Sequence, residues 1–414
     1  MQEIKEVFWN TGGNIIYLAA TWLMTVVVVR LANFEAAGVF SLAMTITAAF
    51  YCISMFGMRS FQVSDVTGEF SDQVYFSSRI ITAAVGMALC FLYCCLSGYS
   101  EYQIGVVLLY MLFKTVEAFS DVSYGFFQKY NHFNYIFWSL TAKGIVSILL
   151  FSLALYFAGD LLITLLVMTL GAGAIYAFYD LRHSRWLVGS FLSKDSSQVW
   201  KLLSATLLLM AVHLVTPVLI AIPRVYYEAH FGSELFGYYS SISAPTVVIS
   251  TFVSCAMMPF LPRYAEYQIQ QQQKRGYQLL VGTVGFTIVF GGICYLMSLW
   301  MGDWALSLLY TPEIVRHAAV LPSIVVSTTC SALVMCLNSF FIATRRMKTL
   351  MVLLLIGCGA SYLFTPFLIE QFAMAGISYT LTVSQCIQAG CMFILACIEI
   401  KKWNLPKKEN NDVC

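Results

Sequence analysis

Charged side chains are scarce in this sequence, in which Asp, Glu, Lys and Arg together make up only 11% of the residues. Average soluble domains carry about 25% of such residues. The composition therefore excludes an ordinary water-soluble domain. The chain is instead 59% apolar, with a mean hydropathy of +0.77. This is typical of a protein embedded in a lipid bilayer.

Long polar segments and catalytic sequence motifs are missing as well. The outer connections near 224–235 and 301–313 barely exceed turns, and no connection is long enough to form a domain. The sequence has no Walker loop, glycine-rich dinucleotide loop or HExxH motif. Its basic residues are scattered over membrane-flanking loops. Nothing here indicates ATP hydrolysis or a nucleic-acid partner.

Cysteine is present, but not where it would form disulfides or metal sites. The 13 cysteines lie in apolar runs or in the tail, and none lies in an outer loop. No cysteine is therefore placed where an oxidising compartment outside the membrane could form a disulfide. Cys90 and Cys94 are one helical turn apart, but no His or acidic ligand accompanies them. We expect no metal ion and no organic cofactor.

Long apolar runs dominate the chain. A membrane-spanning helix needs roughly 20 mostly apolar residues. About twelve such runs can be read, near 10–30, 36–57, 79–98, 102–127, 135–157, 160–181, 201–223, 235–258, 278–300, 314–343, 349–369 and 374–398. We therefore predict an all-α polytopic membrane protein.

The basic residues predict the orientation. If the N-terminus faces the cytoplasm, the opposite side keeps only Arg30, Arg224 and Arg316, and Lys114 is left within a span. Cytoplasmic loops carry the excess of Lys and Arg. An even number of spans then places both termini in the cytoplasm. The nineteen basic residues on that side are Lys5, Arg59, Arg79, Lys129, Lys143, Arg182, Arg185, Lys194, Lys201, Arg263, Lys274, Arg275, Arg345, Arg346, Lys348, Lys401, Lys402, Lys407 and Lys408.

A short internal echo indicates two related halves. Glu35, Gly38, Phe40 and Ser41 before the second span recur as Glu234, Gly237, Tyr239 and Ser240 before the eighth, each 199 positions later. Six spans per half give parallel repeats about an axis along the membrane normal. We predict a six-helix lobe over 1–182, an interfacial linker over 183–200, a second lobe over 201–400 and a basic tail over 401–414. A central cleft between two lobes is typical of alternating-access transporters.

Three charges interrupt the fourth span. Lys114, Glu117 and Asp121 are three and four residues apart, so they share one helical face. A charge at the bilayer centre costs about 2.5–3.5 kcal/mol on insertion scales. Charged residues in spans therefore usually face the interior of the helix bundle and have a functional role. Two interpretations stay open. The three handle substrate or a coupling ion, or Lys114 and Glu117 form a structural pair that leaves Asp121 unpaired.

Four arginines and four helix-bending residues are further candidates. Arg30, Arg59, Arg224 and Arg263 each end a first or second helix of a lobe. An arginine fork suits bidentate phosphate contacts, although cations at span ends are also ordinary snorkelling anchors. The candidate hinges are Gly12, Gly13, Pro217 and Pro223 in the first helices of the two lobes, although Gly and Pro are also common in membrane helices.

The whole chain resembles a known family. The stretches that carry the resemblance are 30–41 (RLANFEAAGVFS), 58–65 (MRSFQVSD), 117–128 (EAFSDVSYGFFQ), 222–228 (IPRVYYE), 231–242 (FGSELFGYYSSI) and 258–266 (MPFLPRYAE). Each is degenerate alone, but their order and positions resemble the bacterial O-antigen and capsule (Wzx-type) polysaccharide flippases. These belong to the multidrug/oligosaccharidyl-lipid/polysaccharide (MOP) exporter superfamily.

The resemblance implies a membrane flippase without enzymatic activity, in the bacterial cytoplasmic membrane. Its substrate would be an undecaprenyl-diphosphate-linked oligosaccharide, moved from the inner to the outer leaflet between two lobes. The cavity candidates carried over are Arg30, Arg59, Arg224, Arg263 and Lys114, with Arg59 and Arg263 favoured near the gate. Glu117 and Asp121 would couple transport to H⁺, Na⁺ or the membrane potential. The partners implied are membrane lipids and the polymerase and glycosyltransferases of the same pathway.

Two alternatives remain. A drug or cation antiporter of the same superfamily should hold acidic residues in its first and seventh spans, and 10–30 and 201–224 contain none. A membrane polymerase or acyltransferase of the pathway is the enzymatic alternative. A polymerase would want a large outer loop with Arg and His, whereas the outer loops here are short and their only histidines are His230 and His317.

Overall fold

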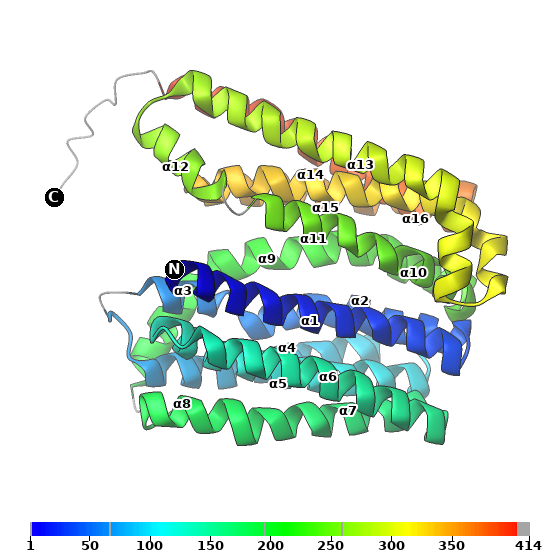
Figure 1. Cartoon of the computed structure of the whole chain (residues 1–414), viewed down its shortest axis with the longest axis horizontal. Helices are drawn as coiled ribbons and strands as arrows, with labels where there is room; N and C mark the ends of the chain where they lie inside the picture. The colour runs from blue at the N-terminus through cyan, green and yellow to red at the C-terminus, as the bar shows by residue number, and fades with distance from the viewer. Residues whose placement is uncertain (1, 66–67, 194, 258–259, 404–414) are drawn as a thin grey trace. The chain divides into compact units, whose positions relative to one another are not determined.

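The computed structural model describes residues 2–65, 68–193, 195–257 and 260–403 (Figure 1). Throughout these ranges the secondary structure is helical, with no β-strand. Within them, twelve helical stretches are long and apolar enough to cross a membrane. The predicted all-α fold with about twelve spans is confirmed, and the protein is a multi-pass membrane protein.

The helices follow one another with short connections. In chain order they are α1 (Gln2–Leu31), α2 (Phe34–Met55), α3 (Met58–Ser64), α4 (Asp72–Leu96), α5 (Glu101–Lys129), α6 (Phe133–Ala158), α7 (Leu161–Ile175), η1 (Tyr176–Asp180), α8 (Leu181–Val188), α9 (Ser196–Phe231), α10 (Ser233–Ser243), η2 (Ala244–Thr246), α11 (Val247–Met257), α12 (Leu261–Ile269), α13 (Gln273–Leu309), η4 (Pro312–Val320), α14 (Leu321–Ala343), α15 (Met347–Phe372) and α16 (Met374–Lys402).

Local sequence explains where several helices begin. The Asn33 side chain accepts a hydrogen bond from the backbone N–H of Ala36 at the start of α2. Ser100 and Gln103 form a reciprocal capping box at the start of α5. Such caps satisfy backbone N–H groups that have no partner within the helix. In a bilayer the remaining backbone groups must be satisfied inside the helix itself, which accounts for the long uninterrupted spans.

The chain forms two compact units. Unit 1 comprises Met1–Ala244 and Ser307–Ile314, and unit 2 comprises Pro245–Leu306 and Val315–Cys414. In unit 1, α1 packs along α6, and α2 packs against α4, α5, α9 and α10 (Figure 1). In unit 2, α16 packs against α14 and α15. The lobes 1–182 and 201–400 with their linker 183–200 remain a prediction, and most of the predicted tail, residues 404–414, lies outside the described residues.

Two breaks depart from the predicted spans. After α2, Phe56 and Gly57 both adopt left-handed backbone conformations, with φ of 52° and 65°, and α3 begins at once. The predicted spans 36–57 and 79–98 leave 58–78 as a connection, and this short helix lies within it. The predicted span 235–258 divides into α10, the 3₁₀ turn η2 and α11. Pro245 lies in that turn, and proline cannot donate the hydrogen bond that a continuous helix requires.

The two copies of the internal echo pack directly on each other. A Cβ atom on Gly38 of α2 would lie 1.7 Å from the carbonyl oxygen of Ser233, and one on Gly237 of α10 would lie 1.8 Å from that of Phe34. No side chain fits in either place, so the two backbones touch as small-residue motifs allow in membrane helices. The Phe34 ring stacks on Tyr238 beside this crossing, with centroids 3.8 Å apart.

Candidate functional site

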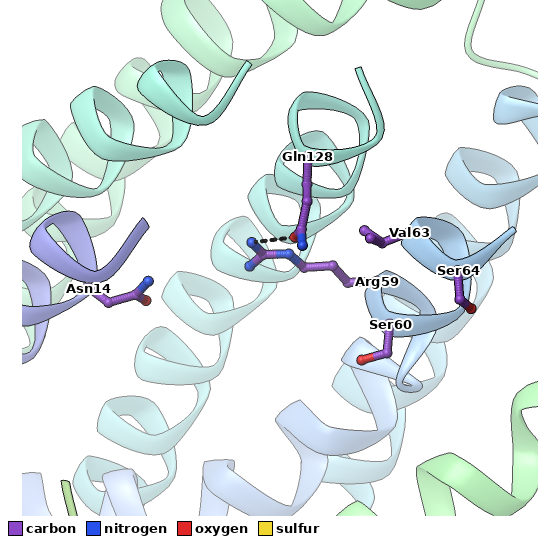
Figure 2. A pocket seen from close by; sticks show the side chains of 6 residues that line it. All are labelled: Asn14, Arg59, Ser60, Val63, Ser64 and Gln128. Carbon is purple, nitrogen blue, oxygen red and sulfur yellow. Dashed lines mark hydrogen bonds between the residues drawn. The ribbon is translucent and has the colours of Figure 1, made fainter. Parts of the chain in front are cut away.

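A polar pocket of about 410 Å³ opens in unit 1 (Figure 2). Three helices line it: α1 contributes Asn14, α3 contributes Arg59, Ser60, Val63 and Ser64, and α5 contributes Gln128. Five of these six side chains are polar, and Arg59 is the cation among them. The pocket is therefore suited to an anionic or hydroxyl-rich ligand.

The break after α2 positions Arg59. Because Phe56 and Gly57 are left-handed, the chain changes direction before α3 and carries Arg59 towards α5. A Cβ atom on Gly57 would lie 2.8 Å from the Leu209 side chain, so both the turn and the packing favour glycine. Arg59 thus lies on the short helix α3, which forms the end of the second candidate span, Phe34–Ser64.

Arg59 reaches across the pocket wall to α5. Its Nη2 donates a hydrogen bond to Oε1 of Gln128, with 3.2 Å between the two atoms (Figure 2). Its Nη1 lies 3.5 Å from Oδ1 of Asp121, and its guanidinium lies 5.6 Å from the centre of the Tyr124 ring. The side chain is 27% exposed. The guanidinium is thus held in place while part of it stays accessible from the pocket.

Asp121 is paired, whereas the structural interpretation of Lys114 and Glu117 left it without a partner. Its Oδ2 accepts a hydrogen bond from Nη2 of Arg79 at 3.1 Å, while its other oxygen faces Arg59. Arg79 is fully buried, although the distribution of basic residues placed it among the cations on the cytoplasmic side. Its position inside the apolar run that starts near 79 was the signal that could have revealed it.

A second buried ion pair also escaped the sequence analysis. Lys143 of α6 lies 2.5 Å from Oδ2 of Asp180, and both side chains are almost completely buried. The ammonium also donates to Ser120 and to the Tyr124 hydroxyl. Lys143 was likewise placed among the cations on the cytoplasmic side, although apolar residues flank it on both sides. Asp180 is the last residue of the π-helical turn η1. Such turns are rare in proteins, and those that occur are often found at functional sites.

Lys114 and Glu117 form the ion pair that the structural interpretation expects, and their role stays a prediction. The Lys114 ammonium lies 2.6 Å from Oε2 of Glu117 on the same helix. The rings of Tyr51, Tyr110 and Phe113 surround the ammonium, with centres 5.3–5.5 Å away. Neither charged residue lines the pocket at Arg59.

The other candidate arginines do not join this pocket. Arg30 donates to the backbone carbonyls of Leu308 and Leu309, the latter at 2.8 Å. Arg224 is half-buried, and its Nε atom has no hydrogen-bond partner. Arg263 lies in unit 2, exposed, with its guanidinium 5.5 Å from the centre of the Phe260 ring. Their roles as cavity residues stay predictions.

The candidate hinges are embedded in helices. A Cβ atom on Gly12 would lie 3.2 Å from the Phe137 ring, and one on Gly13 would lie 3.0 Å from the Phe137 backbone. Both glycines therefore let α1 approach α6 closely. Pro217 and Pro223 lie inside α9, which continues from Ser196 to Phe231. Bending at these four positions stays a prediction.

Comparisons with known proteins identify the family. Residues 4–268, more than half of the chain, match the family described as "Polysaccharide biosynthesis protein". The chain is 24% identical over 396 residues to a "Capsular polysaccharide biosynthesis protein CapF" of Staphylococcus aureus, covering 92% of this chain and 96% of that protein. The matched region begins within α1 and ends within α12.

The fold is that of MOP-superfamily transporters. The structure of a multidrug resistance MATE family transporter in an inward-facing conformation superposes with a TM-score of 0.72 at 10% identity, covering 94% of this chain and 95% of that one. The lipid II flippase MurJ in an inward closed conformation gives a TM-score of 0.71 at 11% identity, covering 96% and 91%. The predicted resemblance is thereby confirmed: this chain has the fold of MOP-superfamily transporters and belongs to the polysaccharide biosynthesis protein family.

Proposed function

We propose that this protein moves undecaprenyl-diphosphate-linked oligosaccharide units from the inner to the outer leaflet of the bacterial cytoplasmic membrane. Alternating access of two lobes would expose the substrate first to one side and then to the other. The observation that carries the proposal is the partly accessible Arg59 guanidinium in a polar pocket among membrane helices. The family and the capsular relative support the pathway.

The chemistry of such a substrate fits this pocket. A diphosphate cannot cross hydrocarbon unaided, because removing a charge from water is costly. An arginine offers two parallel N–H donors that match phosphate oxygens. The neighbouring polar side chains of Ser60 and Gln128 suit sugar hydroxyls or phosphate oxygens. The polyprenyl tail would stay in the lipid, and no bond is made or broken.

Energy coupling belongs to the same proposal. A gradient of H⁺ or Na⁺, or the membrane potential, would drive net movement, with Glu117 and Asp121 as the candidate residues. Polymerase and glycosyltransferases of the pathway would consume and supply the substrate. Both termini would face the cytoplasm.

A reconstituted assay tests transport directly. Proteoliposomes are loaded with a fluorescent undecaprenyl-diphosphate oligosaccharide, and a membrane-impermeant reductant quenches the probe in the outer leaflet. We expect the wild-type protein to make the inner-leaflet probe accessible, and Arg59→Ala and Arg263→Ala to abolish this at normal abundance. Arg59→Lys should restore activity only in part, because a point charge cannot reproduce the fork.

Controls separate the alternatives. Lys402→Gln removes a positive charge from an exposed site in unit 2 and should leave transport unchanged. Uptake of a fluorescent cationic drug by the same vesicles would instead favour the antiporter. Ionophores that collapse the proton gradient, the sodium gradient or the potential identify the driving force. Full activity in both alanine variants would reduce Arg59 and Arg263 to membrane anchors.

A further inference from the structure

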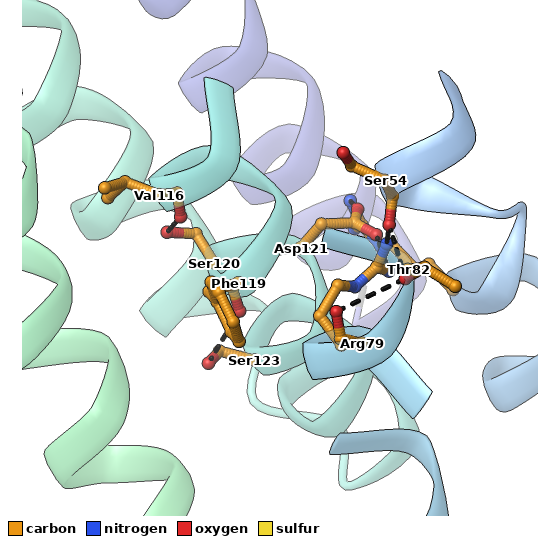
Figure 3. Close-up of polar contacts among 9 residues, drawn as sticks. Ser54, Arg79, Thr82, Val116, Phe119, Ser120, Asp121 and Ser123 are labelled. Carbon is orange, nitrogen blue, oxygen red and sulfur yellow. Dashed lines mark hydrogen bonds and ion pairs between the residues drawn. The ribbon is translucent and has the colours of Figure 1, made fainter. Parts of the chain in front are cut away.

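The fully buried Arg79 connects three helices next to the pocket. From α4, it donates one hydrogen bond to the backbone carbonyl of Ser54 at the end of α2 and one to Asp121 of α5 (Figure 3). Thr82 donates to the same Ser54 carbonyl at 2.9 Å. The Arg79 guanidinium is thereby fixed just before the turn that presents Arg59.

Asp121 is shared unequally between the two arginines. Its Oδ2 lies 3.1 Å from Arg79, and its Oδ1 lies 3.5 Å from Arg59. The closer partner is also the one with no exposure to solvent, and Coulomb attraction strengthens as distance and local dielectric fall. A buried guanidinium also requires a counter-charge. The carboxylate therefore balances Arg79 first.

Charge balance then leaves Arg59 in surplus. In the described structure, nine charged side chains of α3 to α6 and η1 take part in ion pairs with one another: Arg59, Asp72, Arg79, Lys114, Glu117, Asp121, Lys129, Lys143 and Asp180. Three of these pairs are one-to-one and therefore neutral: Lys114 with Glu117 at 2.6 Å, Lys129 with Asp72 at 2.9 Å, and Lys143 with Asp180 at 2.5 Å. With Asp121 balanced by Arg79, one positive charge remains. It belongs to the most exposed member of the set, the one that lines the pocket.

We infer that Arg79 is a positioning residue that neutralises Asp121 and so leaves the charge of Arg59 available to a phosphate-bearing headgroup in the pocket. This inference rests on the proposed function and adds a reason for its selectivity. A pocket with one surplus positive charge attracts an anionic headgroup and repels a cation. Asp121 tunes the strength of this attraction, so that bound substrate can still be released.

Binding of inorganic pyrophosphate to the purified full-length protein tests this inference separately from flipping. We expect wild-type protein to bind pyrophosphate, and Arg59→Gln to lose this binding. Arg79→Gln frees Asp121 to neutralise Arg59, so the dissociation constant should rise on the order of tenfold. Asp121→Asn adds a net positive charge, so the dissociation constant should fall by a similar factor. The double variant Arg79→Gln, Asp121→Asn should return towards wild type.

The opposite directions of these shifts distinguish positioning from a structural role. If the pair only stabilised the fold, both single variants would lower the melting temperature and leave affinity unchanged. The inference would be overturned if Arg79→Gln and Asp121→Asn moved the dissociation constant in the same direction. It would also be overturned if the wild-type protein did not bind pyrophosphate. If Arg79→Gln does not fold, Asp121→Asn and the double variant still decide it. Lys402→Gln serves as the charge-matched control and should not change the affinity.

Flipping measured on the same variants keeps the two proposals apart. With the inference correct, Asp121→Asn should bind lipid-linked substrate at lower concentration but turn over more slowly, because release is hindered. Normal pyrophosphate shifts without any flipping would contradict the proposed function and leave the inference standing. If the variants change pyrophosphate affinity no more than the control does but the wild-type protein still flips the substrate, the inference is contradicted and the proposed function stands.

Discussion

The Lys114 ammonium lies 2.6 Å from the Glu117 carboxylate, one helical turn away on α5, inside a ring of three aromatic side chains. The two side chains are only 17% and 10% exposed. A pair of this kind neutralises itself within its own helix. Replacing both partners of a buried pair is often harmless, whereas removing one partner leaves an uncompensated charge.

We therefore predict that Lys114→Met or Glu117→Gln alone destabilises the protein by about 3–5 kcal/mol. Membrane abundance and the melting temperature in detergent should both fall. The double variant Lys114→Met, Glu117→Gln should recover abundance and transport together. A double variant that folds normally but no longer transports would show that the pair takes part in coupling instead.

The second prediction concerns the crossing of α2 and α10. Gly38→Ala and Gly237→Ala each place a methyl group less than 2 Å from a backbone carbonyl oxygen, so the helices must separate. We expect each change to cost about 1–3 kcal/mol or more and to lower transport. Melting temperature and the flipping assay measure the two effects.

Gly173→Ala is the matched control. This glycine also lies in a membrane helix of unit 1, but no atom lies within 4 Å of the Cβ that alanine would add. Stability should stay equal or rise slightly, because alanine favours helix. Normal stability in Gly38→Ala would mean that the crossing opens without cost.

The third prediction concerns pH. Asp65 lies just beyond a candidate span and accepts hydrogen bonds from the backbone N–H groups of Glu69 and Phe70 and from the Tyr75 hydroxyl. Burial alone would raise its pKa, but these bonds to the charged form outweigh burial and lower the pKa below the usual value. The bonds hold the connection between α3 and α4.

A lowered pKa in the folded state means that Asp65 contributes stability above its unfolded pKa. That contribution is lost as the pH falls through the folded pKa. Between neutral pH and pH 3, the melting temperature of wild type should therefore fall more steeply than that of Asp65→Asn. The exposed Glu313→Gln should follow wild type. Parallel curves for wild type and Asp65→Asn would refute this role.

The fourth prediction concerns orientation and follows from the distribution of Lys and Arg. Single cysteines introduced at Gly189, Gln272 and Lys407 into a chain without its native cysteines should react with membrane-impermeant reagents only from the cytoplasmic side. Lys407 lies outside the described residues, and the other two lie in connections. Labelling of any of the three from outside would contradict the arrangement with both termini in the cytoplasm.

The sequence predicted the membrane fold well because the bilayer constrains it strongly. Apolar runs of about 20 residues must be helices, since only internal hydrogen bonds can satisfy their backbone. The Lys114 and Glu117 pair was also predictable, because residues three apart on a helix are neighbours. These predictions depend only on local spacing.

The rest of the site depends on contacts between helices. Asp121 meets Arg79 of α4, 42 residues earlier, and Lys143 meets Asp180, 37 residues later. No local pattern encodes these distances, so both cations were placed on the cytoplasmic side. The turn that positions Arg59 was missed for another reason: a left-handed Phe56 is unusual for an aromatic residue, and only Gly57 hinted at it.

The contact between Gly38 and Gly237 is reciprocal. Position 38 meets the carbonyl of residue 233, position 237 meets the carbonyl of residue 34, and 199 positions separate both 34 from 233 and 38 from 237. This is an isologous contact, the kind that joins two copies of one subunit in a two-fold dimer, here formed within a single chain. A side chain added at either glycine would collide with the helix that carries the other. A substitution at one of the two positions therefore also changes the packing at the other position.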